Sequence, residues 1–97
     1  MTELEISKAL ALAIGWKELQ IKVTDAVFVW RGYWCIFDHT DWNVIGPIAA
    51  RYDAFPTKTS SGTGWANIAF ETRNPTDVRE ATPQKAIAMA VIEGAKK

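Results

Sequence analysis

The apolar residues at the start of the chain follow the spacing of a helix. Thr2 followed three positions later by Glu5 predicts a capping box, in which each side chain accepts a hydrogen bond from the other residue's backbone N–H. Beyond it, apolar residues recur every three or four positions and share one face: Ile6, Ala9, Leu10, Ala13 and Ile14. We therefore expect a helix over residues 3–14, stopped at Gly15, with Trp16 folded back onto its end.

The pattern then changes to the two-residue period of strands. Apolar and polar residues alternate over 19–24, which indicates a strand with one face exposed to solvent. Two aromatic-rich segments come next, at 26–30 and 33–37, separated by a tight turn at Gly32. In both segments each alternating set is apolar, so we expect both faces of these strands to be covered.

Turn residues at 38–41 lead into a segment in which Pro47 restricts any helix. The Asp and Thr side chains of this turn can bond their own backbone and cap a helix that begins after them. Proline removes a hydrogen bond inside a helix but is favoured at its first position. We therefore expect an irregular turn over 42–46 and a short helix over 47–52.

The next part of the chain predicts two strands and two loops. A weak strand over 54–58 and a stronger one over 65–72 flank the Ser- and Gly-rich loop at 60–64. Residues 73–81 carry scattered charges and a proline, which is typical of a loop. We therefore expect this part to add two strands to the sheet.

A last helix completes the predicted fold. Thr82 and Pro83 supply an N-cap and a proline at the first helical position, and an apolar stripe continues to Gly94. A mostly antiparallel sheet of four or five strands, apolar on both faces, needs helices on both sides. The predicted fold is therefore an α+β, three-layer α/β/α sandwich, one domain over 1–97. Its bulk is expected from buried aromatic residues: Phe28, Trp30, Trp34, Phe37 and Phe70.

The composition agrees with one small folded protein. The chain has 97 residues, 48% hydrophobic and 23% charged, with a formal net charge of zero. No apolar run approaches the roughly 20 residues of a membrane-spanning helix. Glu3 and Glu5 stand where a signal peptide carries positive charge, so we expect a cytoplasmic protein without membrane contact. Lys and Arg are not clustered, which disfavours duplex nucleic acid as a partner.

One short segment holds residue types that could support catalysis or metal binding. Cys35, Asp38, His39 and Asp41 lie within seven residues. A thiol in a buried strand is usually inert, and a nucleophile and its base normally come from distant segments. Three mixed ligands without a spacing signature also make a poor metal site, and the 62–64 segment lacks the lysine and helix of a phosphate loop. We therefore expect no catalytic residue, no metal and no cofactor.

Five tryptophans are the unusual feature of this composition. Trp16, Trp30 and Trp34 are expected in the core. Trp42 stands in a predicted turn and Trp65 beside the glycine loop, so both are expected to be partly exposed. Protein interfaces favour aromatic residues together with arginine. The candidate binding residues are therefore Trp42, Trp65, Arg51 and Tyr52.

Several short motifs resemble a known group of proteins. They are Ala13-Ile14-Gly15-Trp16, Phe37-Asp38, the segment from Asp41 to Ile48 with Tyr52 after it, Trp65-Ala66, and the segment from Pro83 to Ile87. Over nearly the whole chain they resemble the small phage and prophage proteins of the NinX-like and "phage ABA sandwich" type. The resemblance implies a phage or prophage gene product made in the bacterial cytoplasm, with helix–sheet–helix layering. It implies no catalytic residue.

These observations favour a non-enzymatic phage accessory protein that acts through a surface. Its partner would be a second copy or a host or phage protein, because the chain is neutral and rich in aromatic residues. The alternative is a module that binds a nucleotide or signalling molecule. An enzyme using Cys35 and His39 is less favoured. A single-strand nucleic-acid binder that stacks bases on Trp42 and Trp65 is favoured least.

Overall fold

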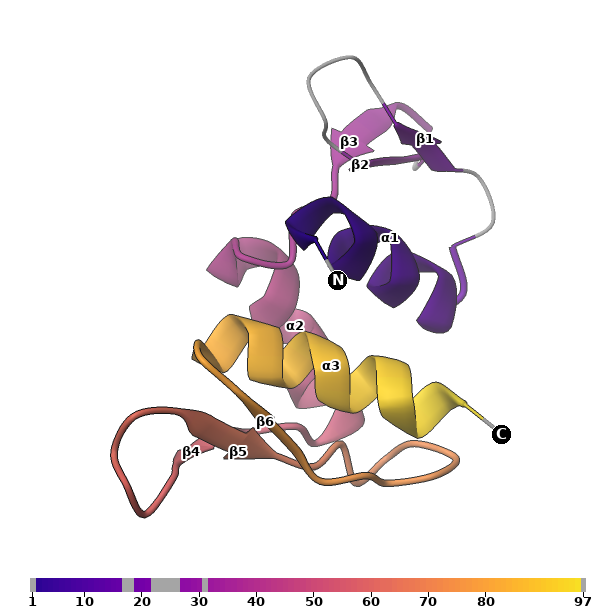
Figure 1. Cartoon of the computed structure of the whole chain (residues 1–97). Coiled ribbons are helices and arrows are strands. Elements are labelled where there is room, and N and C mark those ends of the chain that lie inside the picture. Colours follow the sequence, from indigo (N-terminus) through magenta and orange to yellow (C-terminus); the bar gives the residue numbers. More distant parts are fainter. Residues whose placement is uncertain (1, 17–18, 22–26, 31, 97) are drawn as a thin grey trace.

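The computed structural model describes residues 2–16, 19–21, 27–30 and 32–96. The elements in this part of the chain are α1 (Glu3–Ala13), β1 (Leu19–Ile21), β2 (Val27–Trp30), β3 (Trp34–Ile36), α2 (Trp42–Tyr52), β4 (Thr57–Lys58), β5 (Trp65–Asn67), β6 (Val78–Glu80) and α3 (Pro83–Ala95). Among the described residues, three helices and two three-stranded antiparallel sheets make an α+β protein (Figure 1). We name them sheet A (β1, β2, β3) and sheet B (β4, β5, β6).

Helix α1 begins and ends as its sequence predicts. The Glu5 N–H donates to Thr2 Oγ1 at 3.1 Å and the Thr2 N–H donates to Glu5 Oε1 at 3.2 Å, which completes the capping box. Gly15 has a positive φ of 105°, and the Trp16 N–H donates back to the Ala11 carbonyl at 3.0 Å. This is a Schellman end, and it turns the Trp16 side chain onto the core, as expected.

The prediction of an irregular turn over 42–46 is wrong, because α2 is continuous through Pro47. Asp41 caps the helix by accepting a hydrogen bond from the Asn43 N–H at 2.9 Å. The bond that Pro47 cannot make would reach the Asn43 carbonyl, four residues earlier. Both residues are exposed, so water can solvate that carbonyl and the cost of the proline is small.

The strands form two separate sheets rather than one. In sheet A, Trp30 lies opposite Trp34 across the turn at Gly32, whose φ is 85°. Residues 22–24 and 26 of the predicted strands lie outside the described residues. In sheet B, β5 pairs with β6, which lies within the predicted loop over 73–81, so the loop prediction is wrong for residues 78–80 and holds for 73–77.

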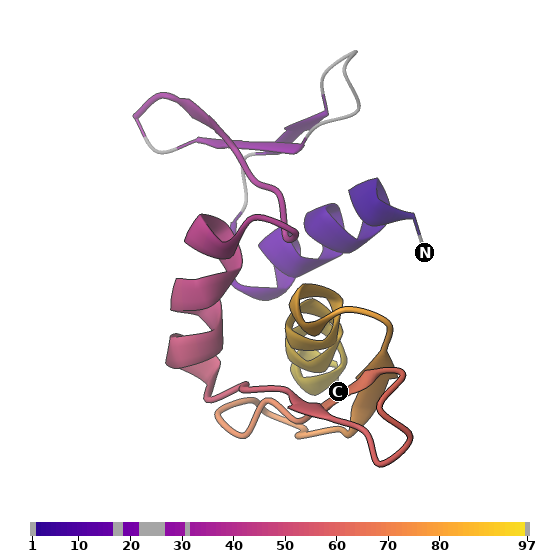
Figure 2. The same ribbon diagram turned by 90° about the vertical axis from the view of Figure 1, so that its left-hand side faces the viewer.

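The helices lie between the two sheets. Sheet A lies beyond α1 and sheet B beyond α3, while α2 packs against α3 in the middle layer (Figures 1 and 2). A three-layer α/β/α sandwich with a central sheet of four or five strands is therefore not confirmed. The layering leaves one face of sheet A without any described helix over it.

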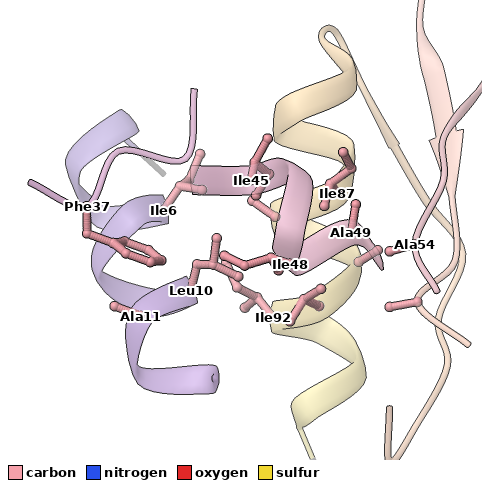
Figure 3. Close-up of a cluster of buried hydrophobic side chains, with 14 of the residues drawn as sticks. Ile6, Leu10, Ala11, Phe37, Ile45, Ile48, Ala49, Ala54, Ile87 and Ile92 are labelled. Carbon is pink, nitrogen blue, oxygen red and sulfur yellow. The ribbon is translucent and has the colours of Figure 1, made fainter. Parts of the chain in front are cut away.

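The core is built mainly from aliphatic residues of the three helices, joined by Val27 and Val29 of β2 and by Ala54 and Ala69. Figure 3 shows them converging, with Phe37 turned toward α1. Phe37 is buried, as predicted, but Trp30, Trp34 and Phe70 are exposed, so their predicted place in the core is wrong. Alanine and isoleucine fill the space instead: Ile6, Ala11, Ile45, Ile48, Ala49, Ala54, Ala69, Ile87, Ala88, Ala90 and Ile92, with Leu10 and Val91.

Candidate functional site

Alternation along β2 and β3 sorts the side chains of sheet A onto two faces. Val27 and Val29 are buried on the inner face, toward α1, and Cys35 pairs with Val29 on that side. The other alternating positions lie on the outer face, because neighbouring residues of a strand point to opposite sides. Phe28 is half-buried there, and we call the three exposed residues of this outer set the aromatic face: Trp30, Trp34 and Ile36.

The two tryptophans form the centre of the aromatic face. Their rings meet edge to face, with centroids 5.3 Å apart and planes at 64°. Trp30 is 43% exposed, Trp34 41% and Ile36 61%. Since a fully exposed aromatic side chain presents roughly 150–250 Å², the two indoles leave about 200 Å² in solvent. With exposed Ile36 added, the patch approaches the roughly 300–600 Å² of the largest apolar patch on a typical monomer, which is often functional.

The sequence pattern finds these residues but places them wrongly. It predicts that both faces of the strands are covered, and the inner face is indeed covered by α1. The other two helices lie away from sheet A: α2 and α3 pack against each other, and α3 covers sheet B. Within the described residues, no helix or strand covers the aromatic face.

The four residues predicted from sequence as a binding surface are not gathered into one site. Trp42 is exposed in the first turn of α2, whereas Arg51 lies nine residues on, about 13 Å along the helix. The Arg51 guanidinium lies 5.1 Å from the ring centroid of half-buried Tyr52. Trp65 is half-buried on β5, and the Lys58 ammonium lies 5.3 Å from its ring centroid. Trp42 and Arg51 are exposed, but they lie near opposite ends of α2, whereas Tyr52 and Trp65 are half-buried.

His39 lies in a polar cluster that the sequence does not reveal. Its ring is fully buried, and Ser7 Oγ lies 2.7 Å from Nδ1 while accepting the His39 N–H at 3.1 Å. The exposed Glu3 carboxylate, 2.9 Å from Nε2, only accepts and so favours the ring proton on Nε2; the Ser7 hydroxyl then donates to Nδ1. Cys35 is not part of this cluster: its Sγ contacts the Tyr33 carbonyl at 4.0 Å. Buried Ser7 links α1 to the connection after β3.

Burial of His39 makes stability depend on pH. Loss of hydration lowers the pKa of His39 below its ordinary value of 6.5, against the opposing attraction of Glu3 and Asp38. The unfolded chain thus takes up the proton first as pH falls, so stability is full above pH 6.5 and declines below it. We expect urea unfolding to show this decline from neutral pH to about 5.5. The His39→Gln variant should show a flatter profile, and an equally steep one would assign the decline to other groups.

The described residues thus define a small α+β protein with an exposed apolar sheet face. Comparison of the chain with protein-family models, with curated proteins and with solved structures gave no match. Among the described residues, no three His, Cys, Asp or Glu side chains are grouped to hold a metal ion. The described helices are all too short or too polar to cross a membrane.

Proposed function

We propose that this chain is a non-enzymatic accessory protein of a bacteriophage or prophage, acting in the bacterial cytoplasm, that self-associates through the aromatic face. The observation that supports self-association is the exposure of paired Trp30 and Trp34 on a sheet face without a described covering element. The phage origin rests on the motif resemblance, chiefly the segments 13–16 and 41–48.

A second copy of this chain suits the aromatic face. The formal net charge of zero means that two copies do not repel each other at neutral pH. A two-fold axis would bring the same face of both copies together, and two sheets pack face to face about 10 Å apart. The two indoles would form the desolvated centre, where a few aromatic residues supply most of the binding energy.

Self-association also accounts for the sequence pattern of sheet A. Strands that are apolar on both faces normally have both faces covered. Within the described chain, α1 covers only the inner face, on which Val27 and Val29 lie. The aromatic face of a second copy would cover the outer one. A stable dimer buries roughly 800 Å² on each partner, so residues around the tryptophans would complete the interface.

Sedimentation of the wild type and of Trp34→Lys over a wide concentration range tests this proposal. We expect the wild type to dimerise and the variant to dissociate more than tenfold more readily, because losing a central interface aromatic costs about 2 kcal/mol or more. Trp42→Lys is the matched control, since Trp42 is 52% exposed but lies on α2. Circular dichroism checks that both variants fold.

The outcomes separate the alternatives. A wild type that stays monomeric at every concentration overturns self-association, and a host or phage protein then becomes the occupant to seek for the aromatic face. Dissociation by Trp42→Lys but not by Trp34→Lys places the interface on α2 and overturns the role of the aromatic face. Equal dimerisation of all three proteins does the same.

A further inference from the structure

A cavity of about 470 Å³ lies on the inner side of sheet A, between β2, β3 and one side of α2. Its floor consists of buried Val29, Phe37 and Ile48, and its rim includes exposed Pro47 and Arg51. The floor is therefore apolar and the rim is open to solvent. Small-molecule sites are commonly apolar hollows of about 300–1,000 Å³ with a few polar groups, so this cavity has the size and lining of one.

The charge of the cavity is set by Arg51. Among the described lining residues, Arg51 is the one charged side chain, and none carries a carboxylate. Within the described part of the chain, the guanidinium has no carboxylate partner and lies against the Tyr52 ring. The Asn43 side chain adds an amide donor on the same rim. An unpaired guanidinium at the edge of an apolar hollow is suited to an anionic group attached to an apolar body.

We infer that this cavity binds a small amphipathic carboxylate. The apolar body, an alkyl chain or a single ring, packs against Val29, Phe37 and Ile48, and the carboxylate pairs with Arg51 at the rim. One cation matches one negative charge, which favours a monocarboxylate over a nucleotide with several phosphate charges. Ile36 borders both this cavity and the aromatic face, but Trp30 and Trp34 do not line the cavity, so the site does not depend on self-association through the two tryptophans.

Cys35 gives a direct measure of whether the cavity is occupied. It lines the cavity, is half-buried and is the single cysteine of the chain. A bound ligand would shield its thiol, so the rate at which iodoacetamide alkylates Cys35 should fall with occupancy. Amide shifts in NMR spectra of α2, at Val44 and Ile48, would locate the ligand on the same cavity.

Octanoate and 1-octanol are the matched probes, since they share the alkyl chain and differ in charge. We expect octanoate to slow alkylation of Cys35 and to shift the α2 amides, and octanol to bind about tenfold more weakly. Arg51→Gln should reduce octanoate binding to the level of octanol. Arg79→Gln, which changes an exposed arginine on β6, should leave it unchanged.

Three results would overturn the inference. The first is that octanoate neither protects Cys35 nor shifts the α2 amides. The second is equal binding of octanoate and octanol, which would remove the role of charge. The third is unchanged octanoate binding in Arg51→Gln. Trp34→Lys should leave octanoate binding intact, so failure of the self-association proposal and failure of this one are distinguishable.

Discussion

Replacing Ser7 with alanine is expected to lower the free energy of unfolding by about 2–4 kcal/mol. The Ser7 hydroxyl donates to His39 Nδ1 and accepts from the His39 backbone N–H, and both residues are buried. Alanine leaves these two groups of His39 without partners and without access to water. Each unpaired buried polar group costs about 1–3 kcal/mol, so the two together account for the expected loss.

Urea unfolding followed by circular dichroism measures the Ser7 effect. Ser60→Ala is the matched control, because Ser60 is an exposed loop residue. A surface change of this kind usually alters stability by less than about 0.5 kcal/mol. If Ser7→Ala were no less stable than Ser60→Ala, the contact between α1 and the segment after β3 would contribute nothing to stability.

Gly94→Ala is expected to destabilise the protein by about 1–2 kcal/mol, although alanine is the better helix former. A β-carbon at Gly94 would lie 2.7 Å from Thr72 Cβ and 3.0 Å from Thr72 Cγ2 and would clash with Thr72 Oγ1. Thr72 Oγ1 donates to the Ala69 carbonyl, so the threonine cannot rotate away without losing that bond. Overpacking costs about 1–3 kcal/mol, and contacts this close belong to the upper half of that range, so the cost exceeds the gain of about 1 kcal/mol in helix propensity.

Gly46→Ala provides the control for the propensity gain. A β-carbon built at Gly46, inside α2, meets no atom within 4 Å. This variant should be about 0.5–1 kcal/mol more stable than the wild type. The change in stability should therefore be negative for Gly94→Ala and positive for Gly46→Ala. Thermal unfolding of both variants measures it. Stabilisation by Gly94→Ala would show that α3 does not pack closely on the loop at Thr72.

The ends of the first and last helices could be predicted because their signals are local. Thr2 with Glu5, and Thr82 with Pro83, lie within one turn of the groups they cap, and the Lys85 N–H does donate to Thr82 Oγ1 at 3.2 Å. Strand β6 has no such local signal. Its three residues become a strand because β5 lies beside them after the chain has folded back.

The layering and the polar cluster could not be predicted for a different reason. Alternation in sheet A shows correctly which side chains share a face, but not whether the cover for that face comes from the same chain. The Ser7 and His39 contact joins residues 32 positions apart, and neither stands in a periodic pattern. Trp42 is exposed as expected, but not for the expected reason, because it lies in the first turn of α2 and not in an irregular turn over 42–46.

The link between Ser7 and His39 also connects the two ends of the segment that contains sheet A. The chain leaves α1, forms sheet A, and returns to α1 at His39. Substitutions on the outer face of sheet A need not disturb the packing of the three helices. The contact surface proposed for that outer face could therefore change in sequence while the packing of the three helices is kept.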